Sequence, residues 1–234
     1  MNELLINIQQ KLSYAGDRKK GIWLEKFVKH GVKSRGVGIP TIKIIIKDFV
    51  KDNDLNGLPQ SKKIELLNGL MKQEFSEDKL AAILLMQLHW NSIENDVQLD
   101  MISEWFNNQW ISDWNICDWL CVRIISPMID NDPQNTIDTL NGWNTDPYLW
   151  KARSSIVPFA QCKTIESHRT IINDFSSNLI IRPERFCKTA VGWVLREYSK
   201  IDKKFVQSFL EKNKKYITQE VFRNATKYFP KSKS

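Results

Sequence analysis

Three tryptophans and two aspartates are crowded into residues 110–119. Trp114 and Asp118 are four residues apart, a spacing that puts an indole and a carboxylate on the same face of an α-helix. A carboxylate can stabilise a developing positive charge or position a water, and an indole offers its electron-rich face to a cation. Tryptophans in helical proteins are mostly core residues, so the spacing alone also fits plain packing.

The other reactive side chains show no pattern typical of a metal or cofactor site. No CxxC pair occurs among the cysteines, so we expect reduced, partly buried thiols. The glycine-rich motifs of nucleotide-binding proteins and the GxSxG motif of hydrolases are also missing from the sequence, and we expect neither a metal nor a cofactor. The cysteines are Cys117, Cys121, Cys162 and Cys187, and the scattered histidines are His30, His89 and His168.

The formal net charge of +7 is distributed unevenly along the 234 residues. Residues 1–50 carry 10 basic and 4 acidic side chains, residues 51–180 carry 10 and 18, and residues 181–234 carry 14 and 5. Two basic ends around an acidic middle indicate a polyanionic partner, with a merely solubilising surface as the alternative. No apolar run is long enough to span a membrane, and residues 1–20 lack the features of a secretory signal, so we expect an intracellular protein, cytoplasmic and nucleoid-associated or nuclear.

The segment with the tryptophans must be positioned by helices, because apolar residues recur at helical spacing almost throughout the chain. Leu80, Ile83, Leu84 and Leu88 are one example, since side chains three and four residues apart share one face of a helix. We therefore expect an all-α chain. The expected breaks between helices are residues 36–40, 53–59, 74–77, 127–133, 142–147 and 201–203.

These breaks recur roughly every 35 to 45 residues, which predicts an α-solenoid of about six antiparallel HEAT-like helix pairs with a basic concave face. We expect one domain over residues 1–234, frayed at 1–10 and 230–234. Ser76 and Thr218 precede acidic first turns and are expected to cap helices. Ile217, Val221, Ala225 and Phe229 form the apolar stripe of a closing helix with a basic exposed side.

Two segments of the second half resemble a known family. Residues 147–153, PYLWKAR, and residues 186–198, FCKTAVGWVLREY, are similar to the corresponding helices of the AlkD-type DNA alkylpurine glycosylases, which are DNA alkylation repair proteins with HEAT-like repeats. Residues 27–40 and 77–86 resemble the N-terminal helix-turn of that family and its next repeat. The resemblance therefore covers most of the chain, and it is most specific in the W-x-x-x-D and [AV]-x-G-W-x-L-R-E elements.

The resemblance assigns roles to four residues. The two tryptophans that embrace the lesion-bearing nucleotide fall on Trp114 and Trp193, the essential carboxylate falls on Asp118, and the arginine that contacts the DNA backbone falls on Arg153. Without the resemblance, Arg153 could be a surface arginine over an indole, and Trp193 could be a core residue. The sequence departs from the family pattern at three positions, which puts the substrate range in question: Asn115, Cys117 and Trp119.

The resemblance implies a monofunctional enzyme that hydrolyses the N-glycosidic bond of cationic alkylated purines in duplex DNA, such as 7-methylguanine and 3-methyladenine. It also implies a monomer that reads the lesion without a deep pocket for a flipped base. Two alternatives remain open at this point. One is a HEAT-like protein that binds DNA structures without catalysis, and the other is a protein–protein scaffold, a common use of helical solenoids.

Overall fold

The computed structural model describes residues 2–230 and divides the chain into two compact units. The first unit ends at Ile124 and the second begins at Ile125. This division falls inside a π-helical turn, Cys121–Ile125, that follows the segment with the tryptophans. Single π-helical turns are rare in proteins and are frequent at functional sites.

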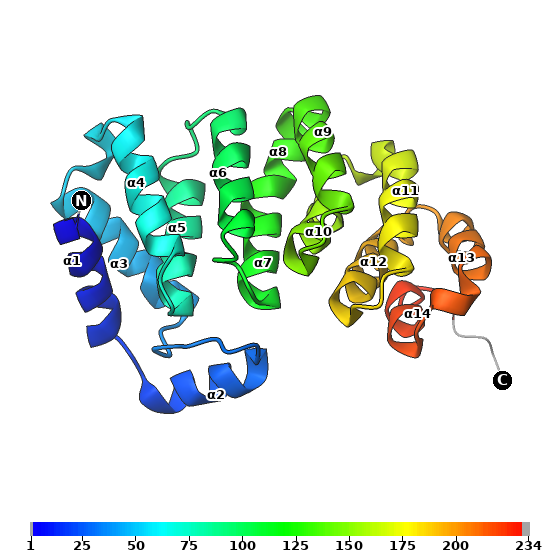
Figure 1. Cartoon of the computed structure of the whole chain (residues 1–234), viewed down its shortest axis with the longest axis horizontal. Coiled ribbons are helices and arrows are strands. Elements are labelled where there is room, and N and C mark those ends of the chain that lie inside the picture. Colours follow the sequence, from blue (N-terminus) through cyan, green and yellow to red (C-terminus); the bar gives the residue numbers. More distant parts are fainter. Residues whose placement is uncertain (1, 231–234) are drawn as a thin grey trace. The chain divides into compact units, whose positions relative to one another are not determined.

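The described part of the first unit is helical throughout, apart from its connections and one isolated bridge between Lys33 and Phe75. Figure 1 shows these helices in blue to green. They are α1 (Asn2–Tyr14), α2 (Arg18–Val28), α3 (Ile39–Asp52), the 3-10 turn η1 (Leu55–Gly57), α4 (Gln60–Met71), α5 (Ser76–Leu88), α6 (Asn95–Asn107) and α7 (Trp114–Leu120).

Helix α5 is the centre of the first unit, because every side chain from Ser76 to Met86 is buried. It packs against α3, α4 and α7, while α1 packs against α3. An apolar helix that is buried on all sides needs neighbours on all sides, so α5 fixes the positions of the helices around it. Trp90 and Trp105, both with no exposed surface, are the largest side chains of this core.

The connection between α2 and α3 is fastened to α5 by a buried carboxylate. Glu77 is only 1% exposed, and it accepts hydrogen bonds from the hydroxyl of Ser34 at 2.7 Å and from the backbone N–H groups of Arg35 and Gly36, both at 2.9 Å. A buried charge is tolerated when it is hydrogen-bonded in this way. The adjacent Asp78, fully buried, pairs with Arg35 at 3.0 Å.

The described part of the second unit is also built from helices, drawn in green to red in Figure 1. Within it, α10 packs against α9, α11 and α12, and α12 also packs against α14. The helices are α8 (Ser126–Asn131), α9 (Pro133–Asn144), α10 (Leu149–Ile156), the 3-10 turns η3 (Val157–Ala160) and η4 (Ile165–His168), α11 (Arg169–Ile180), α12 (Arg185–Tyr198), α13 (Lys203–Lys212), the 3-10 turn η5 (Lys214–Tyr216) and α14 (Gln219–Ala225).

The all-α fold is confirmed for the described residues, but one expected break is wrong. Residues 127–133, expected as a break, include most of α8. Residues 2–10, expected to fray, lie in α1, where Ile8 has no exposed surface, and their fraying stays a prediction. Residues 231–234, the rest of the expected C-terminal fraying, lie outside the described residues.

Of the two expected caps, one is confirmed. Thr218 caps α14 and accepts from the N–H of Val221 at 3.3 Å. Ser76 does not cap α5 but is its first residue, and its N–H donates to the carbonyl of Lys33 at 2.9 Å. A contact with a distant segment therefore decides where α5 begins.

Two further findings concern the described residues as a whole. All four cysteines are free and buried, as the sequence predicts. No helix among residues 2–230 is long and apolar enough to cross a membrane.

Candidate active site

Helix α7 carries Trp114 and Asp118 and begins at a buried capping residue. Asp113 is 2% exposed, and its Oδ1 accepts from the N–H groups of Asn115 at 2.8 Å and Ile116 at 3.0 Å. Burial raises the pKa of Asp113, and the two backbone hydrogen bonds and the nearby Lys79 oppose that rise. The cap satisfies two of the orphan N–H groups of a seven-residue helix and so fixes where it starts.

A buried lysine fixes the loop before α7. Lys79 of α5 is 8% exposed, and its ammonium donates to the carbonyls of Met71 at 2.7 Å and Trp110 at 2.5 Å. Burial lowers the pKa of Lys79 to about 8, and Asp113 and Asp78 oppose that shift. Sequence reasoning missed this residue, because one lysine on an apolar helix carries no local signal of burial.

The indole of Trp114 is half-buried and is held by the end of α2. Its N–H donates to the carbonyl of Val28 at 3.1 Å, and the ring of Phe27 meets it edge-on with 5.6 Å between centroids. Phe27 in turn stacks on Trp23, with centroids 5.1 Å apart and planes 6° from parallel. Trp23 and Phe27 are 59% and 56% exposed, so a line of three rings runs from the α2 surface to α7.

Exposed basic residues lie on the same helix as the exposed ring pair and at its C-cap. They belong to the basic N-terminal segment that the sequence shows. Sequence reasoning missed the pair Trp23 and Phe27, although the two residues are four apart. A surface that combines aromatic rings with cations suits a nucleic acid, which offers stacking bases and phosphates. The basic residues of this helix and its C-cap are Arg18, Lys19, Lys20, Lys26 and Lys29.

Asp118 lies one helical turn after Trp114 and is half-buried, as Trp114 is. Ile116 and Cys117 between them have no exposed surface and pack into the first unit. The helix therefore buries one side and presents Trp114 and Asp118 on the other, which confirms the shared face that the spacing predicts. Trp119 follows, with the guanidinium of Arg123 5.0 Å from the centre of its ring.

In the second unit, Arg153 is buried, whereas a side chain that binds phosphate is expected to be exposed. It is only 4% exposed, and its Nη1 donates to the carbonyl of Phe186 at 2.6 Å and approaches the hydroxyl of Thr189 at 3.3 Å. Both partners belong to α12, the helix that carries Trp193. Arg153 therefore fastens α10 to α12, and its contact with DNA stays a prediction.

Trp193 is half-buried, and its indole N–H is buried without a hydrogen-bond partner among residues 2–230. Its neighbours Ala190 and Val194 have no exposed surface. An unpaired buried N–H is uncommon in folded proteins. Trp193 is thus neither a fully buried core residue nor a freely exposed one.

Of the four predicted residues, Trp114 and Asp118 share one face of α7 in the first unit, and Arg153 contacts the helix of Trp193 in the second unit. Among residues 2–230, no group of three or more His, Cys, Asp or Glu side chains is arranged to hold a metal ion. Within the first unit, Trp114 and Asp118 supply an indole face and a carboxylate, which can stabilise positive charge on a substrate.

Comparisons with known proteins agree with this fold. The model of the DNA alkylation repair enzyme family matches residues 8–229. A solved structure described as a predicted DNA alkylation repair enzyme from Enterococcus faecalis is similar with a TM-score of 0.79 and 16% identity, over 93% of this chain and 98% of that one. No curated protein matches the sequence. Because the family match spans nearly all described residues, the chain belongs to the DNA alkylation repair enzyme family.

Proposed function

We propose that the protein is a monofunctional DNA glycosylase that hydrolyses the N-glycosidic bond of cationic alkylated purines, 7-methylguanine and 3-methyladenine among them, in duplex DNA. The observation that carries the proposal is the face of α7, where Trp114 and Asp118 are both half-buried and the helix start is fixed by Asp113. Membership of a DNA alkylation repair family supplies the substrate context.

Asp118 is the proposed catalytic carboxylate. A cationic base is already a good leaving group, so the main demand is to stabilise the oxocarbenium-like sugar as the bond breaks and to position a water. A unit charge about 4 Å from that cation contributes roughly 4 kcal/mol at an effective dielectric near 20. This corresponds to about three powers of ten in rate.

The tryptophans and the arginine have supporting roles in the proposal. The electron-rich faces of Trp114 and Trp193 favour the positively charged sugar and exclude water from it. Arg153 contacts a phosphate through a charge-assisted hydrogen bond. The aromatic and basic surface of α2 adds affinity for DNA next to Trp114.

The test is the release of free base from a duplex that contains one 7-methylguanine, measured by chromatography under single-turnover conditions. Asp118→Asn should lower the rate by about three powers of ten while leaving duplex affinity within a few fold. Asp100→Asn is the matched control, because it removes an exposed carboxylate of α6 in the same unit and should leave the rate unchanged. Arg153→Ala should weaken duplex binding, with a melting curve to verify folding.

Each alternative function has its own signature in this experiment. Salt-sensitive duplex binding without base release would replace the glycosylase with a non-catalytic DNA-binding protein. Weak, salt-insensitive DNA binding would leave a protein–protein scaffold as the better account. Full activity of Asp118→Asn would remove the carboxylate from the mechanism.

A further inference from the structure

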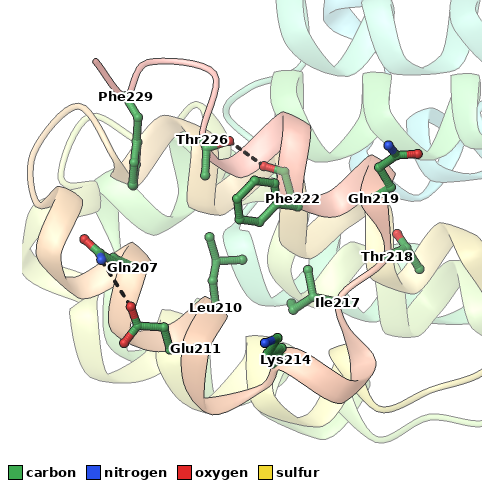
Figure 2. Close-up of a pocket in the computed structure, with 10 residues that line it drawn as sticks. All are labelled: Gln207, Leu210, Glu211, Lys214, Ile217, Thr218, Gln219, Phe222, Thr226 and Phe229. Carbon is green, nitrogen blue, oxygen red and sulfur yellow. Dashed lines mark hydrogen bonds between the residues drawn. The ribbon is translucent and has the colours of Figure 1, made fainter. Parts of the chain in front are cut away.

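The second unit contains an apolar groove that the proposed function does not use. It lies between α13 and α14, has a volume of about 680 Å³ and is shown in Figure 2. Leu210, Ile217 and Phe222 lie together in the middle of that view, and Phe229 lines one end. The volume falls in the range of natural ligand and peptide pockets, about 300 to 1,000 Å³.

The groove leaves aromatic surface in contact with water. Phe222 is 52% exposed, whereas Val221 and Ala225 of the same helix have no exposed surface. About half of the Phe222 side chain therefore remains open to solvent in the groove. A large exposed apolar side chain in a groove is typical of a site that another molecule covers.

The walls of the groove are held in place before any partner binds. Gly192 of α12 lets α14 approach closely, since a Cβ there would lie 3.3 Å from the Cα of Val221. Thr218 caps α14, and the ammonium of Lys188 donates to the carbonyl of Tyr216 at 3.0 Å. A site with fixed walls loses less entropy when it binds a ligand.

The stretch that forms the groove is basic. Residues 203–230 contain seven basic and two acidic residues. Lys214 and one of the acidic residues, Glu211, line the groove itself, and the other, Glu220, accepts two hydrogen bonds from Arg185, at 2.6 and 2.8 Å. The exposed basic side chains of this stretch are Lys203, Lys204, Lys212, Lys214, Lys215, Arg223 and Lys227.

We propose that the groove between α13 and α14 binds an acidic amphipathic helix of a partner protein. The apolar side of such a helix would bury Phe222 and Ile217, and its acidic flanks would face Lys214 and the other exposed basic side chains of residues 203–227. A nucleic acid would match these basic side chains but would leave the apolar floor uncovered. Residues 231–234, Lys-Ser-Lys-Ser, bring no apolar side chain that could fill it.

The experiment is a selection from a phage-displayed library of random 16-residue peptides on the full chain, followed by fluorescence anisotropy with the most enriched peptide. We expect enriched sequences with apolar residues at positions i, i+3 or i+4 and i+7 and with an excess of Asp and Glu. Phe222→Glu and Lys214→Glu should each weaken binding of that peptide by about tenfold or more. Ile181→Glu is the matched control, because Ile181 is 53% exposed and does not line the groove.

The competing occupants give different results. No enrichment, or enrichment of basic peptides, would overturn the proposal. A concentration-dependent dimer that Phe222→Glu abolishes would assign the groove to a second copy of the chain, and loss of duplex binding in Phe222→Glu would assign it to DNA. Base release from 7-methylguanine DNA should be unchanged in Phe222→Glu, so this proposal and the proposed function can fail separately.

Discussion

Lys79 and Asp113 show how individual buried charges position the candidate catalytic helix. The lysine holds the carbonyls of Met71 and Trp110, and the aspartate caps α7. Burial destabilises the charged form of each residue, and the opposite charge of the other residue stabilises it. The two side chains therefore fix both the loop before α7 and the first turn of that helix.

The buried lysine leads to a prediction about pH. Its pKa is about 8 in the folded chain against 10.5 for an ordinary lysine, so the unfolded chain binds more protons between these values. The contribution of Lys79 to the free energy of unfolding is therefore fully present above pH 10.5 and is lost as the pH falls through about 8. Raising the pH from about 8 to 10.5 therefore increases the free energy of unfolding, through Lys79, by at most about 3 kcal/mol.

Urea denaturation of wild type and Lys79→Met at several pH values from 8 to 10 measures this gain. The difference in unfolding free energy should grow in favour of wild type as the pH rises. Lys72→Met, which removes an exposed lysine at the end of α4, should show no such trend. A pH-independent difference for Lys79→Met would mean that the ammonium is not destabilised by burial.

At the scale of elements, the connection from α2 to α3 depends on close backbone contacts. Gly36 has a φ of +80°, and a Cβ there would lie 2.1 Å from the carbonyl oxygen of Asp17 and 2.6 Å from the N–H nitrogen of Gly21. Neither neighbour can move as a flexible side chain would. The same residue donates its N–H to Glu77, so this one position holds α2 against the core.

Gly36→Ala should therefore lower the free energy of unfolding by on the order of 3 kcal/mol. Gly142→Ala is the matched control, because Gly142 is exposed within α9 and a Cβ there would meet nothing within 4 Å. That change should stabilise the protein by about 0.5 to 1 kcal/mol through helix propensity. Equal melting temperatures for the two variants would contradict the close contact at Gly36.

At the scale of the whole molecule, the two units differ in net charge. Residues 1–124 contain 16 basic and 16 acidic side chains, whereas residues 125–234 contain 18 and 11. The net charge of +7 therefore lies entirely in the second unit, and the first unit is basic only locally, as on α2. Affinity for DNA should then depend on where cations lie and not only on how many there are.

The dependence of duplex affinity on salt concentration measures which of these cations contact phosphates. We expect the affinity for an undamaged 20-base-pair duplex, followed by anisotropy, to fall steeply between 50 and 200 mM salt, with a slope of about −0.9 for each phosphate contact. A Lys19→Gln and Lys20→Gln double variant on α2 should reduce that slope by about two. The same charge change at Lys203 and Lys204 on α13 should leave it unaltered, and equal losses from both double variants would contradict a DNA surface at α2.

The sequence by itself determined the features that depend on local periodicity. Helical spacing predicted the all-α chain, the shared face of Trp114 and Asp118, and the cap at Thr218, because each involves residues within one or two helical turns. The resemblance to the repair family also came from short segments, and the match over residues 8–229 confirmed it.

Only the tertiary structure decided the features that depend on distant contacts. The burial of Lys79 and Arg153, the start of α5 at Ser76 and the close contact at Gly36 each arise from groups far apart in the chain. The apolar stripe predicted for the last helix is likewise divided. Val221 and Ala225 are buried, while Ile217 and Phe229 lie outside α14 and line the groove with Phe222. Periodicity shows which residues share a face, but the packing of other helices decides whether that face is covered.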